Sequence, residues 1–481
     1  MPTPLSLAKL LMPEGMTNMA RRNFRWELRA ALLFPLAVAC VEGNILGVLV
    51  AIAFDASPLV VAILGASTAM ANFTGFLWSS LLHGRDRVRF TSILQLGVVA
   101  CAASIAIVPF PTSDSSLAPF SPWIVAGFAL MARILMAGIV TARADLWGAN
   151  YAGPIRARVA SRIAMMVSAV VSVSAVFIGL MMDATHPPEN PQSTLTTLQQ
   201  IGAWLSTMLD PILGEGDHAY RPVFLMAAVA GMIGAALFSR IRWRGGAGQI
   251  SAERKTTSES GSPGPRAMIA VLRSDRDYRR YMTAQYILGV SNLAAIPMVV
   301  VALKDVFQRD YTESLLLTQA IPMIVPVVTL PLWARMIDGM HIVRFRSMHT
   351  WILVLTNLLL ALGFTMQIIQ LVYAAQAVRG LAMAGGMLAW NLGHHDFASR
   401  ELANVYMGIH TTLTGIRGAG APIVGAFLYT GIALTPSLPE LPPIGPMLFY
   451  ISAAGTAFSG VLFIRLAMEL GANTKSKQNS D

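Results

Sequence analysis

The stretch WSSLLHGRDRVRF, residues 78–90, recurs as WARMIDGMHIVRF at residues 333–345, with Trp, Gly, Val, Arg and Phe at the same spacing. Further identities follow at a second constant offset: Arg133 with Arg379, Leu146 with Leu392, Ile163 with Ile409, and Gly179 with Gly425. A sequence that repeats once from end to end indicates two copies of one fold.

The composition indicates a membrane protein. The chain of 481 residues is 55% hydrophobic and 12% charged, with a mean hydropathy of +0.58, whereas soluble domains carry about 25% charged residues. A helix needs about 20 apolar residues to cross the hydrocarbon. Twelve segments meet that length: 29–54, 59–83, 90–111, 122–147, 158–182, 221–241, 281–304, 312–335, 347–368, 370–392, 404–430 and 446–470. Most are continuous apolar runs, so we predict an all-α integral membrane protein with twelve transmembrane helices.

The formal charge of +10 is unevenly distributed along the chain. Most Lys and Arg residues lie in the same alternate loops, and the opposite side holds only Arg221, Lys304 and Arg309. This positive-inside bias predicts a multi-pass protein of the plasma (inner) membrane with both termini in the cytoplasm. The basic charge therefore reflects topology and contact with the lipid bilayer, and we predict no nucleic-acid partner. Cys40 and Cys101 fall inside predicted helices, so neither a disulfide nor a metal site is predicted.

A central segment rich in Gly, Ser and charge divides the chain. The predicted parts are a cytoplasmic N-terminal segment (1–28), a six-helix bundle (29–242), a cytoplasmic linker with an amphipathic helix (243–280), a second six-helix bundle (281–470) and a cytoplasmic tail (471–481). Because each half has six helices, the seventh helix enters the membrane in the same direction as the first. The halves are therefore expected to be parallel repeats.

Twelve helices as six plus six, with a basic central loop and both ends inside, resemble the major facilitator superfamily over about residues 25–470. The family's signature is a Gly-x-x-x-Asp-Arg-x-Gly-Arg type loop between helices 2 and 3, repeated more weakly between helices 8 and 9. The second loop here keeps Asp338 at the position of the motif's Asp, whereas the first has His83 there and Asp86 three residues later. The resemblance implies a permease that works by alternating access. We assign its gating residues to these loops and to the inner end of helix 4: Arg89, Asp338, Arg344 and Asp145.

Glu42 is the only acidic residue near the middle of a predicted helix, and three arginines lie at comparable depth: Arg133, Arg379 and Arg417. Charges inside a membrane are costly and mark candidate functional residues. In the family that the chain resembles, helices 1, 4, 7 and 10 line the central cavity, which implies that Glu42, Arg133 and Arg379 share one space. We predict that Glu42 and Arg133 form an ion pair that couples transport to protons, because movement of the arginine would change the proton affinity of the carboxylate. A static pair that holds two helices together is the alternative.

Arg379, the repeat mate of Arg133, is the predicted substrate contact. Glu42 aligns near Ile296, so only the first repeat carries the buried acid. Further candidate substrate contacts are polar residues on predicted helices: Asn44, Gln285, Asn292 and Asn391. Such amides can equally form interhelical hydrogen bonds. Three arginines against one acid favour an anionic substrate, because a guanidinium suits a carboxylate or a phosphate. An arginine that binds backbone carbonyls instead is the alternative.

The predicted function is secondary active transport of a small organic solute, coupled to protons and performed by a monomer. Neither an enzymatic activity nor a cofactor is predicted, because no Walker phosphate loop, HExxH or GxSxG element occurs. Two alternatives stay open. One is an uncoupled facilitator or anion exchanger, and the other is a transporter-like sensor or assembly protein that does not transport.

Overall fold

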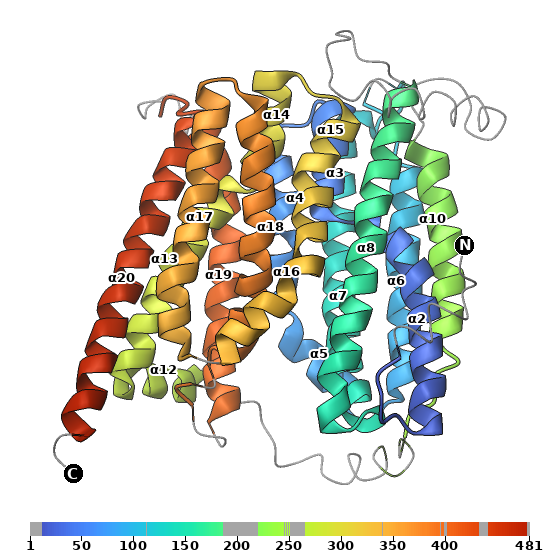
Figure 1. Ribbon diagram of the computed structural model, residues 1–481. Helices are drawn as coiled ribbons and strands as arrows, with labels where there is room; N and C mark the ends of the chain where they lie inside the picture. Colours follow the sequence, from blue (N-terminus) through green and yellow to red (C-terminus); the bar gives the residue numbers. More distant parts are fainter. Residues whose placement is uncertain are drawn as a thin grey trace. The chain divides into compact units, whose positions relative to one another are not determined.

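The protein is described by a computed structural model, which places residues 12–111, 113–185, 220–244, 246, 248, 250, 265–338, 340–394, 396–398, 402–431 and 441–478. These residues form long helices joined by turns (Figure 1), as the apolar runs predict. Their contacts divide the chain into two units. The N-terminal unit contains residues 1–56, 70–260 and 310–316, and the C-terminal unit contains residues 57–69, 261–309 and 317–481.

The N-terminal unit is a bundle in which α10 lies beside α2 and α6, while α6 also packs against α7 (Figure 1). Its helices are α2 (Asn18–Ala39), α3 (Gly43–Ile52), α5 (Gly75–Leu82), α6 (Arg87–Ala106), η1 (Ala118–Phe120), α7 (Ser121–Asn150), α8 (Gly153–Thr185), α10 (Tyr220–Phe238) and α15 (Tyr311–Leu315). The first helix begins at Asn18, earlier than the predicted start at residue 29. Thr17 explains this start, because its hydroxyl accepts the N–H of Ala20 and caps the helix.

The C-terminal unit has α17 between α18 and α20, and α13 contacts both α19 and α20 (Figure 1). Its helices are most of α4 (Pro58–Asn72), α12 (Pro265–Ser274), α13 (Arg276–Ala295), α14 (Met298–Phe307), the π-helical turn η2 (Leu316–Ala320), α16 (Ile321–Asp338), α17 (Ile342–Thr365), α18 (Ile369–Leu392), α19 (Ala403–Thr430) and α20 (Met447–Gln478). The amphipathic helix predicted within residues 243–280 corresponds to α12. It ends at Ser274, because the Asp275 carboxylate accepts the N–H of Tyr278 and starts α13 there.

Ten helical segments among the described residues are long and apolar enough to cross a membrane. The two remaining predicted segments are also helical, but one is divided into α4 and α5 and the other forms the 28-residue α19. The all-α membrane fold predicted from the sequence is therefore confirmed. The predicted linker lies largely outside the described residues, and the domain limits stay a prediction.

The first helix of each repeat is interrupted, which the sequence analysis did not predict. In the N-terminal unit α2 ends at Ala39, and Glu42 has an extended backbone (φ −73°, ψ 127°) before α3 starts. In the C-terminal unit α13 ends at Ala295 and Pro297 precedes α14. Proline has no N–H to donate to the preceding turn, which explains the second interruption. Each interruption is followed by a helix of 10 residues.

Close helix contacts in both units depend on glycine. At Gly179 of α8 an added Cβ would lie 2.6 Å from the Thr312 Cα, so glycine permits α8 to contact α15. The Asp183 carboxylate on the same helix accepts the backbone N–H groups of Tyr311 and Thr312, both at 2.8 Å. It thereby satisfies two of the free donors at the start of α15. In the C-terminal unit, an added Cβ at Gly425 of α19 would overlap the backbone of α13.

Candidate functional site

Glu42 and Arg133 form an ion pair within the N-terminal unit. Arg133 projects from α7, and its Nη2 lies 2.6 Å from the Glu42 Oε2, with 9% and 23% of the two side chains exposed. Glu42 immediately precedes α3, so its carboxylate is close to the positive end of that helix as well as to the arginine. Asn44 lies in the first turn of α3 and is half-buried. The pair combines a partly accessible carboxylate with a buried cation.

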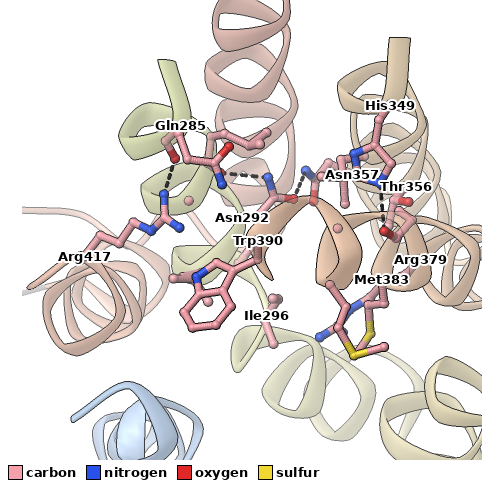
Figure 2. Close-up of a pocket in the computed structure, with 18 of the residues that line it drawn as sticks. Gln285, Asn292, Ile296, His349, Thr356, Asn357, Arg379, Met383, Trp390 and Arg417 are labelled. Carbon is pink, nitrogen blue, oxygen red and sulfur yellow. Dashed lines mark hydrogen bonds between the residues drawn. The ribbon is translucent and has the colours of Figure 1, made fainter. Parts of the chain in front are cut away.

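A cavity of about 470 Å³ lies between α13, α17, α18 and α19 of the C-terminal unit (Figure 2), and we call it the basic cavity. Its basic lining residues are Arg346, His349, Arg379 and Arg417. Its polar lining residues are Gln285, Asn292, Thr356, Asn357 and Thr414. The other described lining residues are apolar or glycine, and none is acidic. The volume is in the range of about 300–1,000 Å³ that small-molecule sites occupy.

Arg379 lies near the middle of α18, with 9% of its surface exposed. Its Nη1 donates to the Oε1 of Gln376 in the same helix at 3.4 Å, a long hydrogen bond. Neither this partner nor any described lining residue of the basic cavity carries a negative charge. The repeat mate of Arg133 is thus a buried cation that faces a cavity without an acid.

Arg417 follows the alternative that the sequence left open, binding to a backbone carbonyl. It extends from α19 across Gly289 of α13 and donates to the backbone oxygen of Gln285 and, at 3.2 Å, to the Thr414 hydroxyl. An added Cβ at Gly289 would overlap the Arg417 side chain. In Figure 2 Arg417 and Arg379 lie on opposite sides of the view, with Asn292 between them.

The cavity amides connect helices. Asn292 of α13 donates to the Leu288 carbonyl at 2.8 Å and to the Thr456 hydroxyl at 3.2 Å, and its Oδ1 accepts from Asn357 of α17 at 3.0 Å. The Gln285 Oε1 is buried and has no hydrogen-bond partner among the described residues. Asn391 lies in the last turn of α18, and its side chain is outside the described part of the structure.

Residues of α17 contribute to the cavity although the sequence analysis did not identify them. Arg346, His349 and Asn357 are each at most 3% exposed. His349 is held by its Nε2, which lies 2.8 Å from the Ala382 carbonyl, and its ring stacks on Phe345. The only signal for them in the sequence was that Arg346 directly follows the repeated Val-Arg-Phe. It was overlooked because the family resemblance directed attention to helices 1, 4, 7 and 10.

Glu27 is a buried acid that the sequence analysis missed. Glu27 of α2 is 1% exposed, and it accepts hydrogen bonds from the Trp147 indole at 2.8 Å and the Tyr151 hydroxyl at 3.1 Å. Arg143 lies 3.6 Å from the same carboxylate. Burial, together with the nearby Glu27 charge, raises the pKa of Tyr151. The predicted limit of the first bundle at residue 29 had placed Glu27 outside the membrane helices.

The predicted gating residues are only partly brought together. Asp145 of α7 pairs with Arg87, with 3.4 Å between Oδ2 and Nη2, whereas Arg89 and Arg344 are exposed. Arg87 is 3% exposed and also donates to the carbonyls of Leu82, at the end of α5, and of Arg85. Asp338 is the last residue of α16, and its side chain is outside the described part. The buried arginine of the first loop is therefore Arg87 and not its exposed neighbour.

The two loops carry an acid and a histidine at interchanged positions. Asp86 caps α6 by accepting the N–H groups of Val88 and Arg89, both at 2.9 Å. At the corresponding position of the second repeat, His341 caps α17 by accepting the Val343 N–H at 3.2 Å. Three residues before each cap, the first repeat has a histidine and the second an aspartate.

Solved structures of membrane transporters share this fold over nearly the whole chain. A point mutant of the nucleoside transporter NupG is 11% identical, with a TM-score of 0.63, and the match covers 92% of this chain and 99% of that chain. The xylose transporter XylE from E. coli, in an inward-open conformation, is 11% identical with a TM-score of 0.61, covering 93% and 96%. A bacterial homologue of the human drug peptide transporters PepT1 and PepT2 is 11% identical with a TM-score of 0.58, covering 95% and 99%. No protein-family model and no curated protein matches the sequence.

Proposed function

We propose that this chain, which has the fold of the major facilitator transporters, moves a small organic solute across the membrane by alternating access and couples that movement to protons. The Glu42–Arg133 pair is the observation that carries the proposal. Carboxylates inside membrane proteins are rare, and they mark proton relays and substrate pathways. One of the structures with this fold is described as a D-xylose-proton symporter.

The proton would be exchanged at the Glu42 carboxylate. While Arg133 lies 2.6 Å away, its positive charge stabilises the ionised carboxylate. When α7 moves relative to the interruption between α2 and α3, that stabilisation is lost and the carboxylate takes up a proton. The interruption assists this step, because the short α3 is not a rigid continuation of α2. Transport then consists of the rocking of two repeats that is typical of this fold.

The solute would bind in the basic cavity, with Arg379 as its main polar contact. Arg346 and His349 add further positive charge or hydrogen-bond donors, while Asn292 and the free Gln285 Oε1 offer neutral contacts. Because no described lining residue is acidic, an anionic solute would neutralise the site. An anion exchanger that uses no protons is the second candidate, and the unneutralised Arg379 favours it.

The test uses purified protein in proteoliposomes and a panel of small organic acids. Inward proton symport alkalinises the external medium, which a pH-sensitive dye reports. We expect Glu42→Gln to abolish solute-driven alkalinisation and to leave solute counterflow, because counterflow needs binding and alternating access without net proton movement. Asp114→Asn, at an exposed loop residue, is the matched control.

Unchanged alkalinisation in Glu42→Gln would refute a coupling role for this residue. Counterflow without alkalinisation in the wild-type protein would favour the anion exchanger or facilitator. Absence of both in the wild type, with solute binding retained, would favour a sensor that does not transport.

A further inference from the structure

The two repeats present the same arginine in different electrostatic surroundings. Arg133 and Arg379 are repeat mates: Arg133 pairs with the residue that precedes α3, and Arg379 lines the same cavity as Ile296, next to the start of α14. The interruptions correspond as well, because α3 and α14 have the same length and follow Glu42 and Pro297 respectively. The environments of the two arginines can therefore be compared position by position.

In the N-terminal unit the protein supplies the anion itself. Glu42 lies at the interruption and its carboxylate is 2.6 Å from Arg133. In the C-terminal unit the interruption carries Ile296 and Pro297, neither of which has a charge. Ile296 and Arg379 both line the basic cavity (Figure 2). The described residues that line this cavity thus include an isoleucine at the interruption, where the other repeat has the Glu42 carboxylate, and no acid.

A buried arginine needs a negative partner. Burying a charge costs several kcal/mol unless an opposite charge and good hydrogen bonds compensate it. Arg379 has one long hydrogen bond to a neutral amide and no acidic neighbour among the described residues that line its cavity. The cavity wall also contains apolar side chains, including Ile296, Met383 and Met387.

We propose that the basic cavity binds a monocarboxylate with an apolar body, whose carboxylate group takes at Arg379 the place that Glu42 takes at Arg133. The proposal rests on the proposed function, since it names the solute class of the same cavity. A carboxylate fits better than a phosphate, because the other repeat satisfies the equivalent arginine with one carboxylate. Arg417 would not add a second contact for a phosphate, because it already binds the backbone of α13. The apolar wall would receive the body of the ligand.

The decisive variant gives the second repeat the acid that it lacks. In Ile296→Glu the new carboxylate would pair with Arg379 and compete with the ligand. The uncharged variant Ile296→Gln has the same length and disturbs the wall equally, so it is the matched control. The probes are acetate, butanoate, hexanoate and benzoate, each measured beside its neutral amide by isothermal titration calorimetry on the purified full-length protein.

We expect the wild-type protein to bind hexanoate or benzoate at least tenfold more tightly than the amide, as a charged hydrogen bond in a buried site predicts. Ile296→Glu should remove this preference, whereas Ile296→Gln should weaken carboxylate and amide by a similar factor and keep their ratio. An equal affinity of the wild type for acids and amides, or an unchanged carboxylate preference in Ile296→Glu, would overturn the proposal. Phenyl phosphate bound more tightly than benzoate would overturn it too.

A second variant covers the case in which Ile296→Glu does not elute as a monodisperse protein. Arg379→Gln should then lose the carboxylate preference, and retention of that preference would overturn the proposal. The outcome is distinguishable from failure of the proposed function. Carboxylate binding without transport would refute the proposed transport function and support this inference. Proton-coupled uptake of neutral solutes alone would support the transport function and refute this inference.

Discussion

A double-mutant cycle at Glu42 and Arg133 would measure how strongly these side chains interact in the folded protein. The cycle compares Glu42→Gln, Arg133→Gln and the double variant with the wild type. Glu42→Gln keeps the length of the side chain, whereas Arg133→Gln keeps a polar group on a shorter one. Any loss of packing at Arg133 is common to the single and the double variant, so it cancels in the interaction energy. The free energy of unfolding is the measured quantity.

The expected magnitude follows from the geometry of the pair. Removing one partner of a fully buried ion pair costs about 3–5 kcal/mol. Glu42 keeps 23% of its side chain exposed, and glutamine still offers a hydrogen-bonding group, so we expect about 2 kcal/mol for each single variant. The double variant leaves no unpaired charge. It should therefore cost less than the sum of the single variants, by about 1.5 kcal/mol.

The assay is denaturant-induced unfolding of the purified protein in mixed micelles, followed by tryptophan fluorescence. Arg133→Gln combined with Asp114→Asn serves as the control cycle, because Asp114 lies in an exposed loop. The control pair should be additive. If Glu42 and Arg133 were also additive within about 0.5 kcal/mol, the two side chains would not form the ion pair on which the coupling proposal depends.

Three further predictions concern helix contacts and the carboxylate at the first interruption. Asp183→Ala should lower the free energy of unfolding by about 1–2 kcal/mol, because two N–H groups of α15 lose their acceptor. Asp114→Ala should leave it unchanged, and thermal denaturation of both variants measures the difference. Gly425→Ala should destabilise the protein by about 1–3 kcal/mol in the same measurement, since the new methyl overlaps the α13 backbone. Gly420→Ala lies in the same helix with open space around it and should not destabilise the protein. Equal effects of the two substitutions would contradict the close contact between Gly425 and α13. Glu42→Ala should lose proton-coupled uptake. Added formate or acetate should restore part of it, because these ions replace the missing carboxylate. Absence of rescue in a folded variant would count against a direct role for the Glu42 carboxylate.

The sequence predicted the helices well because hydrophobic length alone determines which segments can cross a bilayer. It did not predict the interruptions before Gly43 and Met298, since each lies inside a segment that is long and apolar enough to be taken as one continuous helix. Pro297 was a visible signal for the second. Nothing comparable marks the first, where the extended backbone of Glu42 ends the hydrogen-bond pattern of α2.

Candidate site residues could be predicted inside the membrane helices, where charged residues are rare. In the loops, where charged residues are common, the sequence did not distinguish between them. Glu42 and Arg133 were paired from their depth and from the family resemblance, which puts their two helices around one cavity, and the structure places them in contact. The loop arginines could not be separated in this way, because Arg87 and Arg89 stand two residues apart and only packing shows which one is buried. Similarly, the binding of Arg417 to a backbone carbonyl depends on the space above Gly289, which no pattern in the sequence reports.

The exchange of acid and imidazole between the two loops has a consequence for how each helix start is held. The Asp86 carboxylate accepts two N–H groups of α6, whereas the one acceptor nitrogen of His341 accepts only the Val343 N–H of α17. The neighbouring N–H, that of Ile342, is accepted by Asp396 at 2.6 Å. The start of α6 is therefore capped within its own loop, whereas the start of α17 also depends on a residue 54 positions further along the chain.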